Sequence, residues 1–138
     1  MEKIIVSKVA PEPDLDSHRG QTGLQSATPL RLRDLADYQD GAIVSRALSS
    51  KKNGTITLFA FDQGQGLSEH ISPFDAFVHI LEGNAEITVT GKSFLINEGE
   101  IVILPANQPH ALKALSKFKM LLTMIRSGEL ISLQERKV

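Results

Sequence analysis

The sequence predicts an all-β domain, an antiparallel sandwich or barrel, on three observations. From Gly41 onward, short apolar segments alternate with turn residues at steps of about 8–12 residues, which is typical of such folds. No long helical pattern follows these segments, so a parallel α/β sheet is not expected. A length of 138 residues is enough for one domain with a hydrophobic core and too short for two ordinary ones.

The N-terminal part is expected to lie outside the main sheets. Residues 3–9 contain a short β-branched run that predicts a first strand, whereas residues 11–27 are rich in Pro, Gly, Ser, Gln and Asp and indicate a surface arm. Residues 30–38 fit either a short helical turn or an extended segment. The predicted organisation is therefore an N-terminal strand and flexible connection (1–28), a barrel (29–126) and a C-terminal tail (127–138).

Turn residues bound each strand expected in the barrel. The clearest strand is 55–61, which is β-branched and aromatic and alternates at its start. The turn at 62–66 ends it, and residues 82–84 form a hairpin connection further along. The other expected strands are 42–48, 76–81, 85–90, 93–96, 101–104, one that begins at Ala111, and 118–125.

Several of these strands are apolar on both faces. The run 118–125, with sequence FKMLLTMI, carries more apolar side chains than one face of a strand can bury. The inner face of a barrel lines its interior, so the outer face must be covered by an arm or by a second subunit. We therefore expect a homodimer.

Composition excludes several classes of function. A hydrophobic fraction of 41%, a charged fraction of 22% and a formal net charge of −1 describe a globular protein with no expected nucleic-acid or membrane partner. Cysteine is absent, so thiolate catalysis and disulfides are excluded. The apolar run at residues 4–6 is too short for a signal sequence or a membrane span, so we expect a cytoplasmic protein.

Residues 64–83 carry the first of two patterned segments. Gly64, His70 and Gly83 match the first glycine, the first histidine and the last glycine of the motif G-x5-H-x-H-x3,4-E-x6-G, which is typical of cupins. Ser72 stands at the position of the second histidine, and Ala76 at that of the glutamate. This segment resembles the motif with two polar positions replaced.

Residues 99–114 resemble the second cupin motif, G-x5-P-x-G-x2-H-x3-N. Gly99, Pro105 and His110 match it, whereas Asn107 replaces a glycine and Ala114 replaces the asparagine. The resemblance covers about residues 40–126, and the chain is identified as similar to the small single-domain proteins of the cupin 2 conserved barrel family. It implies a double-stranded β-helix, or jelly-roll, barrel.

Side chains two residues apart share one face of a strand, and the resemblance implies that the shared face here is the barrel interior. His70 and His110 are then expected to face each other in a small-molecule cavity. The other expected pocket residues are Ser72, Ala76, Val78, Ile80 and Leu112. His79 falls on the opposite face.

The resemblance also raises the question of a metal. In typical cupins three histidines and one glutamate hold a divalent ion, and imidazole and carboxylate ligands suit Fe, Mn, Ni, Cu or Zn. Here two histidines, His70 and His110, stand at matching positions, and two imidazoles alone bind weakly. Asp75 and Glu69 lie next to motif positions, and a β-bulge would turn either carboxylate inward. The expectation is a reduced divalent-metal site of two histidines and one carboxylate.

Three functions remain open from the sequence. One is a metal-dependent enzyme that acts on a small polar molecule. The second is a metal-free barrel that binds or senses a small molecule without catalysis. The third is an oligomeric accessory protein whose interior is filled with side chains. Neither the catalytic residues nor the ligand can be assigned, because pocket chemistry is not set by the strand pattern.

Overall fold

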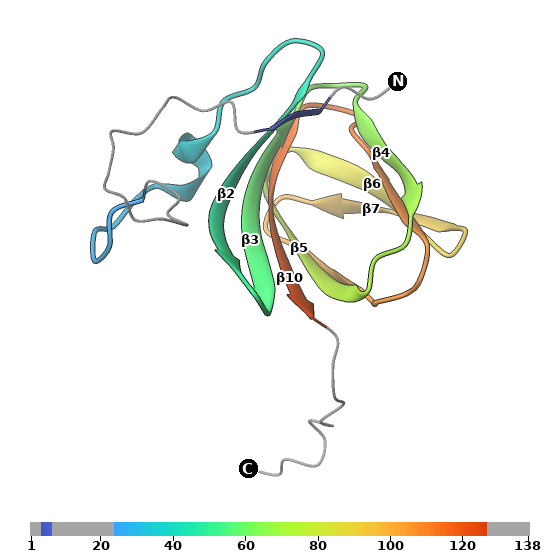
Figure 1. The fold of residues 1–138 in the computed structure, drawn as a ribbon. Helices are drawn as coiled ribbons and strands as arrows, with labels where there is room; N and C mark the ends of the chain where they lie inside the picture. Colours follow the sequence, from blue (N-terminus) through green and yellow to red (C-terminus); the bar gives the residue numbers. More distant parts are fainter. Residues whose placement is uncertain (1–3, 7–23, 127–138) are drawn as a thin grey trace.

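A computed structural model describes residues 4–6 and 24–126 of the chain and shows two β-sheets that face each other (Figure 1). Nearly every regular element is a strand, as the sequence predicts. The elements are β1 (Ile4–Val6), the 3-10 helix η1 (Leu32–Leu35), β2 (Ile43–Lys51), β3 (Gly54–Phe61), β4 (Gly66–His70), β5 (Phe74–Glu82), β6 (Asn84–Val89), β7 (Lys92–Asn97), β8 (Ile101–Leu104), β9 (His110–Lys113) and β10 (Phe118–Arg126).

The two sheets form the jelly-roll arrangement expected from the motifs. The first has six strands in the order β1-β2-β3-β10-β5-β8, and the second has four in the order β4-β9-β6-β7. Each pairing is antiparallel except that of β1 with β2. Because β10 lies between β3 and β5, the last strand of the barrel is central to the larger sheet. This position explains its long apolar run.

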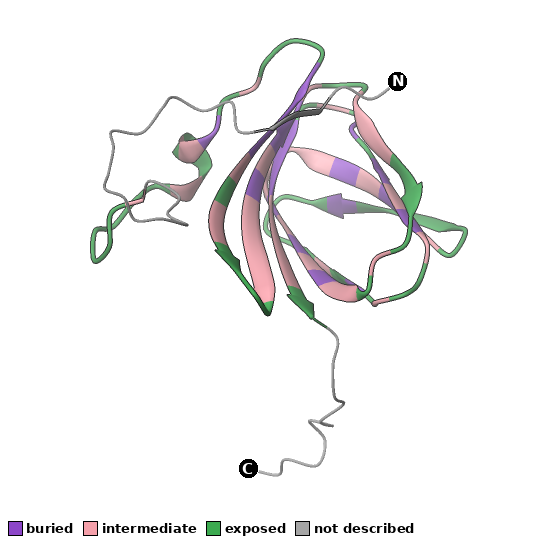
Figure 2. Ribbon diagram, viewed as in Figure 1, coloured by how far each residue is buried: buried purple, intermediate pink, exposed green. Residues whose placement is uncertain are grey.

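The core between the sheets includes an aromatic part around Phe61 and Phe118, and Figure 2 shows buried positions on strands of both sheets. The rings of Phe61 and Phe118 are fully buried and stack with centroids 4.5 Å apart. An aromatic pair of this kind contributes about 0.5–1.5 kcal/mol beyond the area it buries. Phe118 begins β10, and the inward side chains of the same strand continue through Met120 and Leu122 to Met124. The strand therefore leads away from the aromatic part of the core.

Residues 32–38 cover part of the outer face of the larger sheet. This segment contains η1 and settles the alternative left open for residues 30–38 in favour of a helical turn. A second hydrophobic cluster forms beneath it, in which Leu35, Ala36 and Tyr38 pack on Val44 and Leu58. The apolar outer faces of β2 and β3 are thus covered here by a segment of the same chain.

Polar contacts fix this segment to the barrel. The ammonium group of Lys119, a residue only 7% exposed, donates to the backbone oxygen of Arg33 at 2.7 Å and lies 5.1 Å from the centre of the Tyr38 ring. The Tyr38 hydroxyl donates to Glu82 at 2.7 Å. Burial, together with the Glu82 carboxylate, raises the pKa of Tyr38 well above its usual range, so the phenol stays protonated as a donor.

Lys119→Met is expected to lower the free energy of unfolding by about 1.5–3 kcal/mol, because it removes a charge-assisted hydrogen bond while keeping the aliphatic stem. Lys117→Met is the matched control. Lys117 also lies over the Tyr38 ring but is exposed, so its replacement should cost under about 1 kcal/mol. Urea unfolding of both variants measures the difference, and equal losses would contradict the role given to Lys119.

The structure contains a strand that the sequence did not predict. β4 has one apolar residue, Leu67, and no alternation, so residues 62–66 indicated only a turn. Pairing with β9, not local pattern, makes this segment a strand. The predicted tail at 127–138 and most of the predicted arm at 1–28 lie outside the described residues. The described residues include no helix that is long and apolar enough to cross a membrane.

Candidate functional site

The two motif histidines are neighbours in space. His70 ends β4 and His110 begins β9, and their Cα atoms are direct partners in the antiparallel pairing of these strands. A bulge between Leu67 and His70 shifts the register at this point. The two imidazole rings meet edge to face, with centroids 4.4 Å apart and an angle of 70° between the ring planes. Two histidines that are forty positions apart in the sequence thus form one pair of facing rings.

Backbone carbonyls orient both imidazoles. The Nδ1 atom of His70 lies 2.8 Å from the backbone oxygen of Ser68, and that of His110 lies 3.1 Å from the backbone oxygen of Gln108. A carbonyl oxygen only accepts hydrogen bonds, so Nδ1 carries the proton in each ring. In the neutral form the Nε2 atom of each ring is then free to accept a hydrogen bond or to bind a metal.

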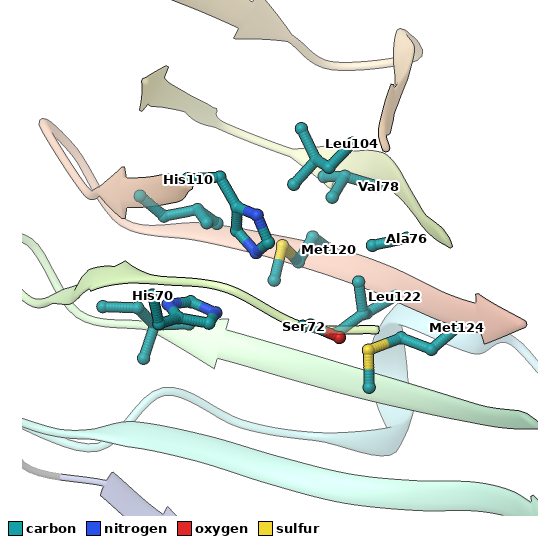
Figure 3. Close-up of a pocket in the computed structure, with 11 residues that line it drawn as sticks. His70, Ser72, Ala76, Val78, Leu104, His110, Met120, Leu122 and Met124 are labelled. Carbon is teal, nitrogen blue, oxygen red and sulfur yellow. The ribbon is translucent and has the colours of Figure 1, made fainter. Parts of the chain in front are cut away.

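Both rings line a cavity of about 200 Å³ that is partly open to solvent (Figure 3). This volume is somewhat larger than the roughly 150 Å³ cavity that accepts benzene in another protein. Most of the wall is apolar. The lining residues other than the two histidines are Leu67, Ser72, Ala76, Val78, Leu104, Leu112, Met120, Leu122 and Met124.

Four of the five other residues predicted for the pocket lie on its wall: Ser72, Ala76, Val78 and Leu112. For the fifth residue, Ile80, the prediction is wrong. This residue shares the inward face of β5, but it is fully buried in the core opposite Met120 and does not line the pocket. Ile80 instead belongs to the buried core cluster that contains Phe61 and Phe118.

The pocket includes three residues of β10 that were not predicted from the sequence. The inward side chains of this strand, Met120, Leu122 and Met124, line the pocket opposite the histidines. Their spacing of two indicates that they share one face of the predicted strand 118–125. That this face lines the pocket follows from the pairing of Leu122 and Met124 with Val78 and Ala76, which only the structure shows. Leu104, at the end of the predicted strand 101–104, pairs with Ala76 from β8 in the same way. Leu67 lacked any such signal.

The two histidines differ in their surroundings. His110 is 5% exposed, whereas His70 is exposed at the edge of the cavity. Burial lowers the pKa of His110; the hydrogen bond to Gln108 opposes this shift, and the nearby His70 adds to it. His110 is therefore neutral at neutral pH and presents a lone pair, not a charge, to the cavity.

The lowered pKa of His110 predicts a pH-dependent stability. The unfolded chain binds a proton at His110 near pH 6.5, whereas the folded protein binds it only at lower pH. The free energy of unfolding should therefore fall as pH decreases from about 7.5 toward the folded pKa. His110→Gln should flatten this part of the curve, which urea unfolding between pH 5 and 8 measures. An unchanged slope in the variant would contradict the assignment.

Neither carboxylate expected as a metal ligand lies in the pocket. Asp75 follows the outward alternation of β5, and its side chain accepts the backbone N–H of Ala106 at 2.9 Å. Glu69 is exposed and does not line the pocket. The bulge in β4 does not bring Glu69 inward. The carboxylate ligand predicted from the sequence is thus absent from this arrangement, because Asp75 instead fixes the loop before His110.

The donor set does not fit a tightly bound metal. Within residues 4–6 and 24–126, no three or more His, Asp or Glu side chains are grouped closely enough to hold an ion. A stable transition-metal site normally has three or four protein ligands, and two imidazoles provide fewer.

Loop contacts hold the two histidines in place. The backbone N–H of Asn107 donates to the backbone oxygen of Ser72 at 2.7 Å, which joins the second motif to the first. Asn107 adopts φ +65°, a left-handed conformation that Asn tolerates better than most residues, and this explains how it replaces a glycine there. The Ser72 hydroxyl oxygen accepts the N–H of Phe74 at 3.1 Å. The hydroxyl hydrogen of Ser72 remains available to donate a hydrogen bond.

Comparisons with known proteins agree with the fold and the two motifs. A family model described as a cupin domain matches residues 57–126. A conserved protein of unknown function from Streptococcus pyogenes is 33% identical, with a TM-score of 0.75, over 83% of this chain and 100% of that one. No curated protein matches the chain significantly.

Two further solved structures are similar. A cupin 2 conserved barrel domain protein from Leptotrichia buccalis is 40% identical, with a TM-score of 0.69, over 70% of this chain. The match spans 47% of the Leptotrichia chain, about half of its length. A cupin superfamily protein from Desulfitobacterium hafniense is 28% identical, with a TM-score of 0.73, over 80% of this chain and 100% of that one.

Proposed function

The chain belongs to the cupin domain family, and from that premise we propose that it is a small-molecule binding barrel that works without a tightly bound metal. One observation carries the proposal. The cavity combines a mostly apolar wall with two imidazoles and one hydroxyl, and no third metal ligand from the described part of the chain joins them. Apolar pockets with a few convergent polar groups are typical ligand sites.

The positions of Ser72 and Ala76 support this proposal. They stand where typical cupins carry a histidine and a glutamate, and both line the cavity beside the two remaining histidines. The replacements remove two ligands and leave space and apolar surface in their place. A ligand that enters this space would contact the side chains of β5 and β10 and hydrogen-bond to the imidazoles.

Metal content and fragment binding test the proposal together. Protein purified without a nickel column should contain far less than one transition-metal ion per chain by elemental analysis. One-ring fragments observed by NMR should bind to it. Leu122→Phe fills the cavity and should abolish binding, whereas Thr123→Val, on the opposite face of β10, should not. Equal binding to both variants would contradict a ligand site in this cavity.

A second candidate, a metal-dependent enzyme, is favoured by the orientation of the rings. Both Nδ1 atoms bond to carbonyls and both Nε2 atoms are free, which is how metal-binding histidines are commonly held. Near-stoichiometric metal in the native protein, lost in His110→Ala, would support this candidate and overturn the first.

The homodimer and the cytoplasmic location predicted from the sequence stay predictions. Exposed apolar side chains on β7 and β8, among them Leu95, Ile101 and Ile103, favour a dimer. Light scattering during gel filtration measures the mass in solution. A monomer at micromolar concentration would contradict the dimer.

A further inference from the structure

We infer that the cavity selects an uncharged molecule about the size of one ring, which donates O–H or N–H hydrogen bonds to the facing His70 and His110. This inference rests on the proposed function and adds the chemical class of the ligand. Its basis is the hydrogen-bonding inventory of the wall, the absence of charged groups among the lining residues, and the size of the space.

The hydrogen-bonding groups of the cavity wall favour a ligand that donates hydrogen bonds. Because each Nδ1–H is already donated to a backbone carbonyl, the imidazoles face the ligand as acceptors. A ligand with only acceptor atoms would leave the lone pair of the buried His110 unpaired, and a buried unpaired group weakens binding. The Ser72 hydroxyl is the one lining side chain with a hydrogen free to donate in this state. Two acceptors and one donor thus surround the space.

The wall offers no countercharge to an ionic ligand. The cavity-lining residues include no Asp, Glu, Lys or Arg, and His70 and His110 are the titratable ones. Burial keeps His110 neutral, as its lowered pKa indicates. An anion or a cation would lose its hydration without gaining an opposite charge, which is strongly unfavourable. An uncharged ligand avoids this loss.

Size and surface limit the ligand further. About 200 Å³ accommodates one six-membered ring with a small substituent. The thioethers of Met120 and Met124 lie on the wall, and methionine sulfur packs favourably against ring edges. The centroids of the two imidazole rings lie 4.4 Å apart, so one small ligand can contact both. A hydroxyl donates its one hydrogen to one imidazole, and a second adjacent donor is needed to pair the other.

Four probes of similar size separate these features: phenol, toluene, benzoate and benzylammonium. We expect calorimetry at pH 7.5 to give about tenfold tighter binding of phenol than of toluene, because one hydrogen bond contributes a factor of this order. Benzoate and benzylammonium should bind more weakly than toluene. Toluene binding as tightly as phenol, or either ion binding more tightly than phenol, would overturn the inference but leave the proposed cavity site intact.

Variants connect the preference to the imidazoles. His110→Leu should remove the advantage of phenol over toluene while retaining toluene binding. His79→Leu is the matched control, because His79 lies on the opposite face of β5 and should change neither affinity. A phenol preference that persists in folded His110→Leu overturns the role of His110. If none of the probes binds, the proposed function fails, and this inference fails with it.

Discussion

Ser72→His combined with Ala76→Glu is expected to give the barrel a metal site of about one ion per chain. Both positions line the cavity with His70 and His110, so the double variant brings three imidazoles and one carboxylate to one space. This set meets the number and type of ligands that divalent transition metals require. Without metal, the new carboxylate at residue 76, where the native side chain is 3% exposed, should destabilise the fold.

Thermal unfolding with and without Zn²⁺ or Ni²⁺ measures how far bound metal stabilises the double variant. Metal at 100 times its dissociation constant stabilises a folded protein by about 2.7 kcal/mol, so a rise in Tm of several degrees is expected. Adding His110→Ala to the double variant should reduce the rise, because one ligand is lost. The parent chain should show little change. A folded double variant that metal does not stabilise would show that these side chains fail to converge.

Strand and turn patterns predicted most of the fold because their determinants are local. The β-branched alternation of residues 55–61 and the turn residues that bound each hairpin act within a few positions of the chain. The spacing of Gly64, His70 and Gly83 added the family architecture, which local pattern alone could not supply. The meeting of the two histidines followed from that architecture.

The remaining features depend on contacts between distant segments. β4 becomes a strand by pairing with β9, and its bulge at Leu67–His70 cannot be read from five mostly polar residues. The role of Asp75 depends on a loop thirty-one positions away, because its carboxylate accepts a hydrogen bond from the backbone N–H of Ala106. The buried state of Ile80 depends on its packing in the core cluster that also contains Phe61 and Phe118. Such distances in space do not follow from periodicity.

Gly83→Ala is expected to be the most destabilising single substitution proposed, at about 3–5 kcal/mol. Gly83 lies between β5 and β6 with φ +80°, a conformation that L side chains rarely adopt. A Cβ atom here would also collide with the backbone oxygen of Lys117 and lie 2.9 Å from Cα and Cβ of Phe118. These are backbone or near-backbone atoms, so relief requires a shift of β10 where Phe118 stacks on Phe61.

Gly91→Ala separates the two causes of this loss. Gly91 has the same φ of +80° but nothing within 4 Å of the position of an added Cβ. It should therefore cost only the conformational strain, about 1–2 kcal/mol. Urea unfolding of both variants gives the excess at Gly83, which reports the close approach of β10 to the turn. Equal losses at the two positions would mean that the start of β10 shifts without cost. Gly83 would then be required only for the conformation of the turn.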